Sequence, residues 1–306
     1  MGVAGDDRSG GRPSVLRIVA RAARRAWGRD VMLYTGGVSF FALLAVFPAL
    51  ALLIAAYRLF SRPELATAQA EALTRILPPS AQSMIENELV RLSEAPLQAV
   101  STQSLLALLI GAYAAHRGFK ALLAGLAFVH HEGQQLGFFR FNMLALIVAI
   151  GSFALIVLIS GALVTVRVVE KTLGLHLPHI AWFYNEWLWA GSGLSLGLTC
   201  IYRYAMSHKR PVLWLAAAVG AVTAAGLSLF ASWACAFYVQ NVVHLSATYG
   251  SVGTVVVFLI WLSWNVNAVL FGGALATEVE IAIRSEPAAS SLSPQPSTVR
   301  GPLFRR

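Results

Sequence analysis

The feature that most constrains the fold is a long uncharged stretch in the C-terminal third of the chain. From Gly250 to Thr277, 28 residues contain no Asp, Glu, Lys or Arg. About 20 apolar residues in a helix cross a bilayer, so this stretch can span a membrane with residues to spare. We therefore predict a tilted transmembrane helix over 249–280. Its asparagines, Asn265 and Asn267, carry amides that are costly in hydrocarbon unless they face protein or water.

Composition extends this prediction to most of the chain. Hydrophobic residues make up 57% of the 306 residues, and charged residues make up only 12%. A soluble domain carries about 25% charged residues. The sequence therefore predicts an all-α polytopic membrane protein, a six-transmembrane-helix bundle with interfacial amphipathic helices. The predicted spans cover 31–60, 97–115, 138–166, 186–206, 211–240 and 249–280.

Three segments flank or interrupt the spans. Residues 1–29 form a basic tail that contains an amphipathic helix, with arginines on one face and apolar residues on the other. Residues 61–96 are amphipathic and predict a helical hairpin outside the cytoplasm. Residues 284–306 are rich in Ser, Pro and Ala and are expected to be disordered. The predicted membrane domain is therefore 30–283.

The distribution of Lys and Arg predicts the orientation. The segments placed inside hold seven, three, three and four basic residues, seventeen in all, and those placed outside hold three and two. Positive residues concentrate on the cytoplasmic side of membrane proteins, so both termini are expected in the cytoplasm. The same rule accounts for the net charge of +9 without a nucleic-acid partner, and membrane lipids are the expected surroundings.

Six residues within the spans are candidates for a substrate pathway. Proline removes a backbone hydrogen bond from a helix, so the proline of the first span is either a packing kink or a hinge. Embedded Ser and Asn either join helices by hydrogen bonds or line a polar groove, and glycines permit close helix contact. The candidates are Ser39, Pro48, Asn265, Asn267, Gly272 and Gly273.

The fifth span carries a ridge of small residues. Ala, Gly or Ser recurs at every fourth position, which places these residues on one face of a helix and predicts close contact with a neighbour. The ridge consists of Ala216, Gly220, Ala224, Ser228, Ser232 and Ala236.

Ionisable residues avoid the middle of every predicted span and gather at the cytoplasmic ends. They serve either as interfacial anchors or as an ion-pair network that closes a cytoplasmic gate. The gate candidates are Asp30, Arg117, Arg140, Arg203 and Glu278.

Motifs that carry catalysis are missing from the sequence. There is no P-loop, no dinucleotide-binding glycine fingerprint, no GxSxG and no CxxC. His130, His131 and Glu132 form one cluster of metal-ligand types, but adjacent histidines on a helix point about 100° apart and do not converge on one ion. We therefore expect no enzymatic activity, no catalytic residues, no metal and no cofactor.

Two stretches resemble a known family. SFFALLAVFPALALLIA at 39–55 and YGSVGTVVVFLIWLSWNVNAVLFGGALATEVE at 249–280 are similar to the YihY / virulence factor BrkB family of bacterial inner-membrane proteins. The resemblance covers about 30–283. The chain departs from the family pattern after the second span. There the sequence Lys120-Ala121-Leu122-Leu123 stands in place of an Arg-Ala-Leu-Asn-type helix.

The resemblance implies a six-span protein of the bacterial inner membrane. The expected function is that of a transporter, exporter or flippase for a lipid-like or small organic substrate of unknown identity. One alternative is a non-transporting envelope scaffold, and association with further copies of the chain stays open. Another is a ribonuclease, a label once given to members of the family. Metal-dependent RNA cleavage needs converging carboxylates or histidines, so we do not expect this activity.

Overall fold

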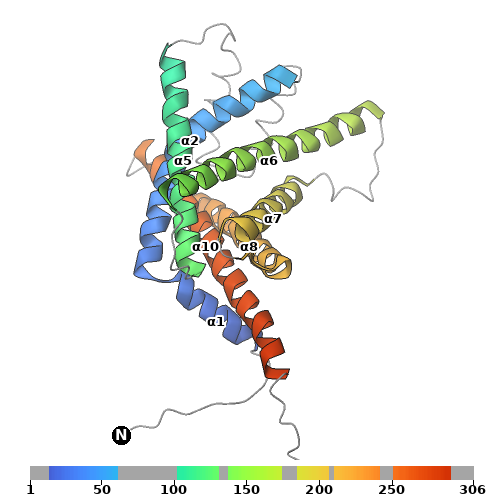
Figure 1. Ribbon diagram of the computed structural model, residues 1–306. Coiled ribbons are helices and arrows are strands. Elements are labelled where there is room, and N and C mark those ends of the chain that lie inside the picture. The colour runs from blue at the N-terminus through green and yellow to red at the C-terminus, as the bar shows by residue number, and fades with distance from the viewer. Residues whose placement is uncertain are drawn as a thin grey trace, which may run out of the picture.

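The chain folds into helices throughout its described parts. The computed structural model describes residues 14–60, 102–130, 137–173, 185–206, 210–241 and 251–290. Within these residues there are seven helices and no strand, which confirms the all-α fold class (Figure 1). The helices are α1 (Val15–Ala26), α2 (Arg29–Phe60), α5 (Thr102–His130), α6 (Phe138–Leu173), α7 (Glu186–Tyr204), α8 (Trp214–Asn241) and α10 (Ser251–Ser290).

Five of these helices are long and apolar enough to cross a membrane. The candidate spans are Asp30–Leu52, Leu105–His130, Phe138–Leu163, Trp214–Tyr238 and Val255–Ser285. The fourth predicted span, 186–206, corresponds to α7, which is not among them. The mean hydropathy of this 19-residue helix is lowered by its glycines, its serines, two tryptophans and Arg203. A multi-pass membrane protein is confirmed, and six spans stay a prediction.

The helix of the second predicted span runs further than its predicted end at 115. α5 continues to His130, and its apolar part begins at Leu105. The two basic residues that follow position 115 are good helix formers, and their charges lie over aromatic rings, which stabilise a cation. The Arg117 guanidinium is 5.7 Å from the centroid of the Phe41 ring, and the Lys120 ammonium is 5.4 Å from that of Phe138.

The segments outside the spans agree with prediction in part. α1 is the helix expected within the basic tail. α10 continues to Ser290, so residues 284–290 of the tail predicted to be disordered are helical. Arg284 pairs with Glu280 one turn earlier at 2.6 Å, and such an ion pair supports helix. The predicted hairpin over 61–96 lies outside the described residues, as do 1–13 and 291–306.

The ridge of small residues on α8 packs against α10, as predicted. The backbones approach so closely that a Cβ added at Gly220 would lie 2.4 Å from the Gly272 carbonyl oxygen. A Cβ at Gly272 would lie 2.6 Å from the Cβ of Ala224. Small residues let helices associate in lipid because packing, rather than the hydrophobic effect, holds them together there. Only glycine fits at either of these two positions without a shift of the helices.

A second close contact joins α2 and α5 through glycines spaced seven residues apart. Each glycine of α5 meets one bulky residue of α2, and those three residues are also seven apart. The numbers rise along one helix as they fall along the other, so the two helices are antiparallel. The pairs are Gly111 with Pro48, Gly118 with Phe41, and Gly125 with Tyr34.

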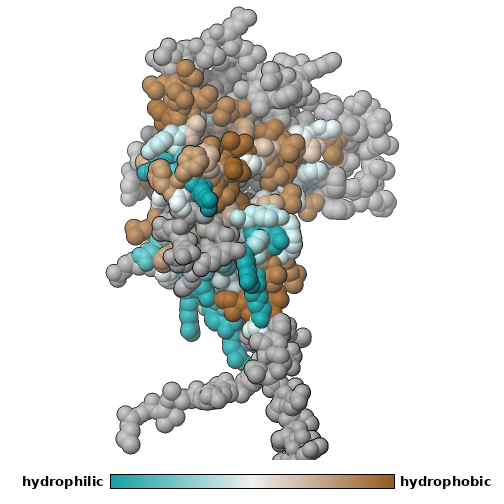
Figure 2. All heavy atoms as spheres, in the orientation of Figure 1, coloured by the Kyte–Doolittle hydropathy of each residue, from teal (hydrophilic) through white to brown (hydrophobic). Residues whose placement is uncertain are grey.

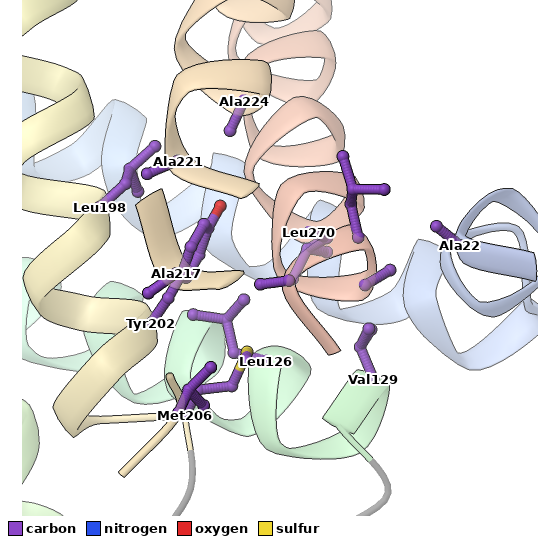
Figure 3. Packing of buried hydrophobic residues seen from close by; sticks show 14 of the residues in the cluster. Ala22, Leu126, Val129, Leu198, Tyr202, Met206, Ala217, Ala221, Ala224 and Leu270 are labelled. Atoms are coloured by element: carbon purple, nitrogen blue, oxygen red, sulfur yellow. The ribbon is translucent and has the colours of Figure 1, made fainter. Parts of the chain in front are cut away.

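The largest buried cluster lies where α1, α2, α5, α7, α8 and α10 meet. Tyr202 of α7 is fully buried there beside Leu126 of α5 and Leu270 of α10 (Figure 3). The Tyr202 hydroxyl donates a hydrogen bond of 2.6 Å to the Val269 carbonyl oxygen. A buried hydroxyl without a partner would cost free energy, so this bond fixes the register of α7 against α10. Ala22 brings α1 into the same cluster.

The described surface is divided between apolar and polar regions. Large apolar side chains are exposed along the span helices, as expected where a helix faces lipid. Hydrophobic colours dominate the upper part of Figure 2, and hydrophilic residues gather at the lower end, over α1 and the C-terminal part of α10. A bundle that stands in a membrane with α1 at one interface has this distribution.

The contact between α8 and α10 predicts a strong difference between two glycines of the same helix. Gly220→Ala is expected to destabilise the protein by about 1–3 kcal/mol because the added methyl group collides with the α10 backbone. Gly226→Ala is the matched control: a Cβ there meets nothing within 4 Å, so no loss is expected. Thermal unfolding of the purified protein in detergent measures both. Equal midpoints for the two variants would contradict the close approach.

Candidate functional site

A cavity lies between the long helices of the bundle. Its volume is about 560 Å³, and its walls are formed by α2, α5, α6, α7, α8 and α10. Ligand sites for small molecules have volumes of roughly 300–1,000 Å³ and mostly apolar walls. Most lining residues here are Ala, Val, Leu, Ile and Phe, together with Gly118 and Trp261. Its volume and its apolar walls make this cavity the candidate site.

Four hydroxyl or amide side chains interrupt the apolar wall. Ser152 comes from α6, Ser228 and Ser232 from α8, and Asn265 from α10. A chain of hydrogen bonds links α8 to α10 at the wall: the Ser232 hydroxyl donates to the Ser228 carbonyl oxygen at 2.9 Å and accepts from the Trp261 indole at 2.9 Å. The Asn265 amide donates to the Trp261 carbonyl oxygen at 2.8 Å. The Ser232 hydroxyl and the Asn265 amide are thus held in fixed positions.

Of the six pathway candidates, Asn265 alone lines this cavity. Ser39 and Asn267 lie in the contact between α2 and α10 instead. Thr35 donates to the Asn267 side-chain oxygen at 2.9 Å, and the Ser263 and Ser39 hydroxyl oxygens lie 3.3 Å apart. The bond from Thr35 joins the two helices, which is the interhelical use of embedded polar groups. The two predicted asparagines therefore have different surroundings, although they are only two residues apart.

The other three pathway candidates pack helices together. The Pro48 ring occupies space that Gly111 leaves free on α5. Gly272 faces α8, and a Cβ at Gly273 would lie 2.6 Å from the Leu126 side chain of α5. All three positions determine how closely their helices approach one another.

Glu278 is the gate candidate with the most specific environment. Its side chain is only 3% exposed, yet both carboxylate oxygens are paired. Arg21 is 2.8 Å from one oxygen and Arg25 is 2.5 Å from the other. Both arginines belong to α1, so the two ion pairs attach the amphipathic helix to the end of α10. We call this arrangement of Arg21, Arg25 and Glu278 the α1 clamp.

The remaining gate candidates do not join the α1 clamp. Asp30 and Arg140 are exposed. Arg117 lies over the rings of Phe41 and Tyr113. Arg203 lies 4.6 Å from the centroid of the Trp214 ring and donates to the Val212 carbonyl oxygen. Arg117 lies midway along the candidate span Leu105–His130, not at its end as predicted, and the aromatic rings stabilise its charge there. Arg203, in the last turn of α7, suits an interfacial anchor.

Sequence reasoning missed the partners of Glu278. Arg21 and Arg25 are four residues apart, so they project from the same side of α1. That spacing is visible in the sequence, but the amphipathic pattern alone predicts that the arginine face of α1 lies on the lipid surface. The carboxylate of Glu278, close to the end of a span, was the one sign in the sequence that some of these arginines have a protein partner.

Neighbouring polar contacts surround the α1 clamp. His130 of α5 lies 2.9 Å from the Thr277 hydroxyl, which precedes Glu278. Arg25 also donates to the Val129 carbonyl oxygen at 3.4 Å, so α1, α5 and α10 meet at this point. Within the described residues, no three His, Cys, Asp or Glu side chains come together as metal ligands would.

The α1 clamp predicts that two arginines of α1 matter for docking and two do not. Replacing Arg21 and Arg25 by Ala leaves the Glu278 carboxylate buried without an opposite charge. Such a loss costs about 3–5 kcal/mol for a fully buried pair, and less here because Arg21 is half-exposed. We expect amide hydrogen exchange across Val15–Ala26 to accelerate.

In the control, Arg17 and Arg24, which are exposed, are replaced by Ala, and exchange should stay as in the unaltered protein. Equal acceleration in both double variants would refute the α1 clamp.

The family model described as Virulence factor BrkB matches residues 22–296. No curated protein and no solved structure matches the chain.

Proposed function

The chain belongs to the virulence factor BrkB family, and from this premise we propose that it moves a lipid-like amphiphile across the bacterial inner membrane. The observation that carries the proposal is the cavity of about 560 Å³ between six helices. Its lining is mostly apolar, which suits an acyl or similar chain better than a hydrated solute. Of the substrates expected from the sequence, the lipid-like class is therefore favoured over small polar molecules.

The α1 clamp supports a cytoplasmic closure in this proposal. α1 lies across the end of α10 and is held there by charge, whereas the cavity lies between the spans. Release of two ion pairs would free α1 and loosen the contacts of α5 and α10 at that end. Closure by a segment that switches between docked and free states is a common way to gate access to a buried site.

A scaffold function is the second candidate, and one surface feature favours it. Phe230, Trp233 and Phe237 form a row of contacting rings on α8, and all three are more than half exposed. Aromatic side chains are enriched at protein interfaces. This row would suit another membrane protein or a second copy of the chain.

Transport is tested by filling the cavity. Ala149 of α6 lines it, whereas Ile150, the next residue, is 61% exposed on the outside of the same helix. We expect Ala149→Trp to abolish translocation and Ile150→Trp to leave it intact. The assay uses proteoliposomes with acyl-labelled phosphatidylethanolamine, phosphatidylglycerol or glucosyl diacylglycerol, and follows their appearance in the outer leaflet by dithionite quenching. The proposal fails if the unaltered protein accelerates none of the three lipids, or if both variants behave alike.

Orientation is tested with single cysteines. Ser14→Cys before α1 and Ser285→Cys near the end of α10 are introduced after Cys200 and Cys235 are replaced by Ala. Seventeen basic residues on the predicted inner side against five outside predict that both positions lie in the cytoplasm. A membrane-impermeant maleimide should therefore label neither in intact bacterial cells and both after permeabilisation. Labelling of one position alone in intact cells would require an odd number of spans.

A further inference from the structure

The walls of the cavity carry no charge. Its lining residues, which come from six described helices, include no Asp, Glu, Lys, Arg or His. An ionised group buried without an opposite charge is strongly disfavoured. A phosphate, carboxylate or ammonium head group would find no partner on these walls. The part of any ligand that enters this chamber is therefore uncharged.

Two hydrogen-bonding groups of the wall are left unused. The Ser228 hydroxyl is buried, with the residue 3% exposed, and has no partner among the described residues. The Asn265 amide nitrogen is used by the Trp261 carbonyl oxygen, whereas its side-chain oxygen accepts no hydrogen bond from the described part of the chain. Buried polar groups are nearly always paired, so an unpaired hydroxyl on a cavity wall calls for an explanation.

The Asn265 amide is fixed in place by its neighbours. It donates to the Trp261 carbonyl oxygen, and the Trp261 indole donates to the Ser232 hydroxyl, which in turn donates to the Ser228 carbonyl oxygen. These bonds join α8 to α10 but do not include the Ser228 hydroxyl, which is covered and can turn about its Cα–Cβ bond. Asn265 is therefore pre-organised for a ligand, whereas the Ser228 hydroxyl turns toward the cavity to bind one.

We propose that Ser228 and Asn265 bind a hydroxyl group on an otherwise apolar molecule. A hydroxyl is both donor and acceptor, so it can accept from Ser228 and donate to the side-chain oxygen of Asn265. The apolar body then fills the rest of the cavity between α2, α5 and α6. This inference rests on the proposed function and narrows its substrate class to amphiphiles with an uncharged alcohol head.

The test compares three photoactivatable probes that share one diazirine-bearing alkyl chain. Their heads are a hydroxyl, a sulfate and a trimethylammonium group, so charge is the main difference. The full-length protein in lipid nanodiscs is labelled with each probe, with and without an excess of the unlabelled compound. Labelled peptides are then mapped by mass spectrometry. We expect competable labelling of cavity residues such as Ser152 and Ile156 by the alcohol, and little by the two charged probes.

Two variants test the assigned contacts independently. Ser228→Ala and Asn265→Leu should each lower competable alcohol labelling by about two- to tenfold, the range for loss of one neutral hydrogen bond. Ser263→Ala is the matched control, since Ser263 lies on α10, bonds to the Leu259 carbonyl oxygen and does not line the cavity. Its labelling should equal that of the unaltered protein. Size-exclusion profiles check that all three variants fold.

Each other outcome overturns a defined part of the inference. If the sulfate or the ammonium probe labels the cavity as well as the alcohol does, the uncharged head is wrong, although translocation of lipids still stands. If the alcohol is preferred but Ser228→Ala and Asn265→Leu change nothing, these two residues are wrongly assigned. If no probe labels the cavity competably, the inference and the proposed function both lose the cavity on which they depend.

Discussion

The close approach of α8 and α10 at Gly220 and Gly272 determines the geometry on which the candidate site depends. Because no side chain separates the two backbones there, residues further along the same helices come within hydrogen-bonding distance. Ser232 then meets the Trp261 indole, and the cavity wall acquires its row of polar groups. Tyr202 of α7 lies beside the same contact, and its hydroxyl donates a hydrogen bond to the Val269 carbonyl oxygen of α10. One backbone contact therefore organises both the buried cluster and the cavity.

Much of the fold was predictable because hydrocarbon imposes a simple rule on composition. Long uncharged stretches of sequence predicted the positions of α2, α6, α8 and α10. The spacing of small residues on α8 predicted a close contact with a neighbouring helix, which is α10. The end of α5 was missed because Arg117 and Lys120 resemble linker residues until aromatic rings from other helices are known to cover them. The match between the glycines of α5 and Tyr34, Phe41 and Pro48 was visible as two seven-residue spacings, but nothing in either segment alone indicates its partner.

The site was less predictable because it depends on distances between helices. Asn265 and Asn267 are equivalent in composition, yet one lines the cavity and the other bonds to Thr35. Ser228 belongs to a ridge that the sequence explains fully by packing, and its unused hydroxyl is apparent only once α6 and α10 are in place. Glu278 was chosen for its position at the end of a span, whereas its arginine partners lie more than 250 positions earlier in the chain.

That separation has a consequence for how the protein is made. Arg21 and Arg25 leave the ribosome before any membrane span, and Glu278 follows only after all the other helices of the bundle have been synthesised. Until Glu278 has been added, neither ion pair of the α1 clamp can form, and an amphipathic helix such as α1 can rest on the bilayer surface. One of the first helices to be translated is thus among the last to gain its ion pairs. A chain that stops short of Glu278 keeps apolar contacts of α1 but neither ion pair.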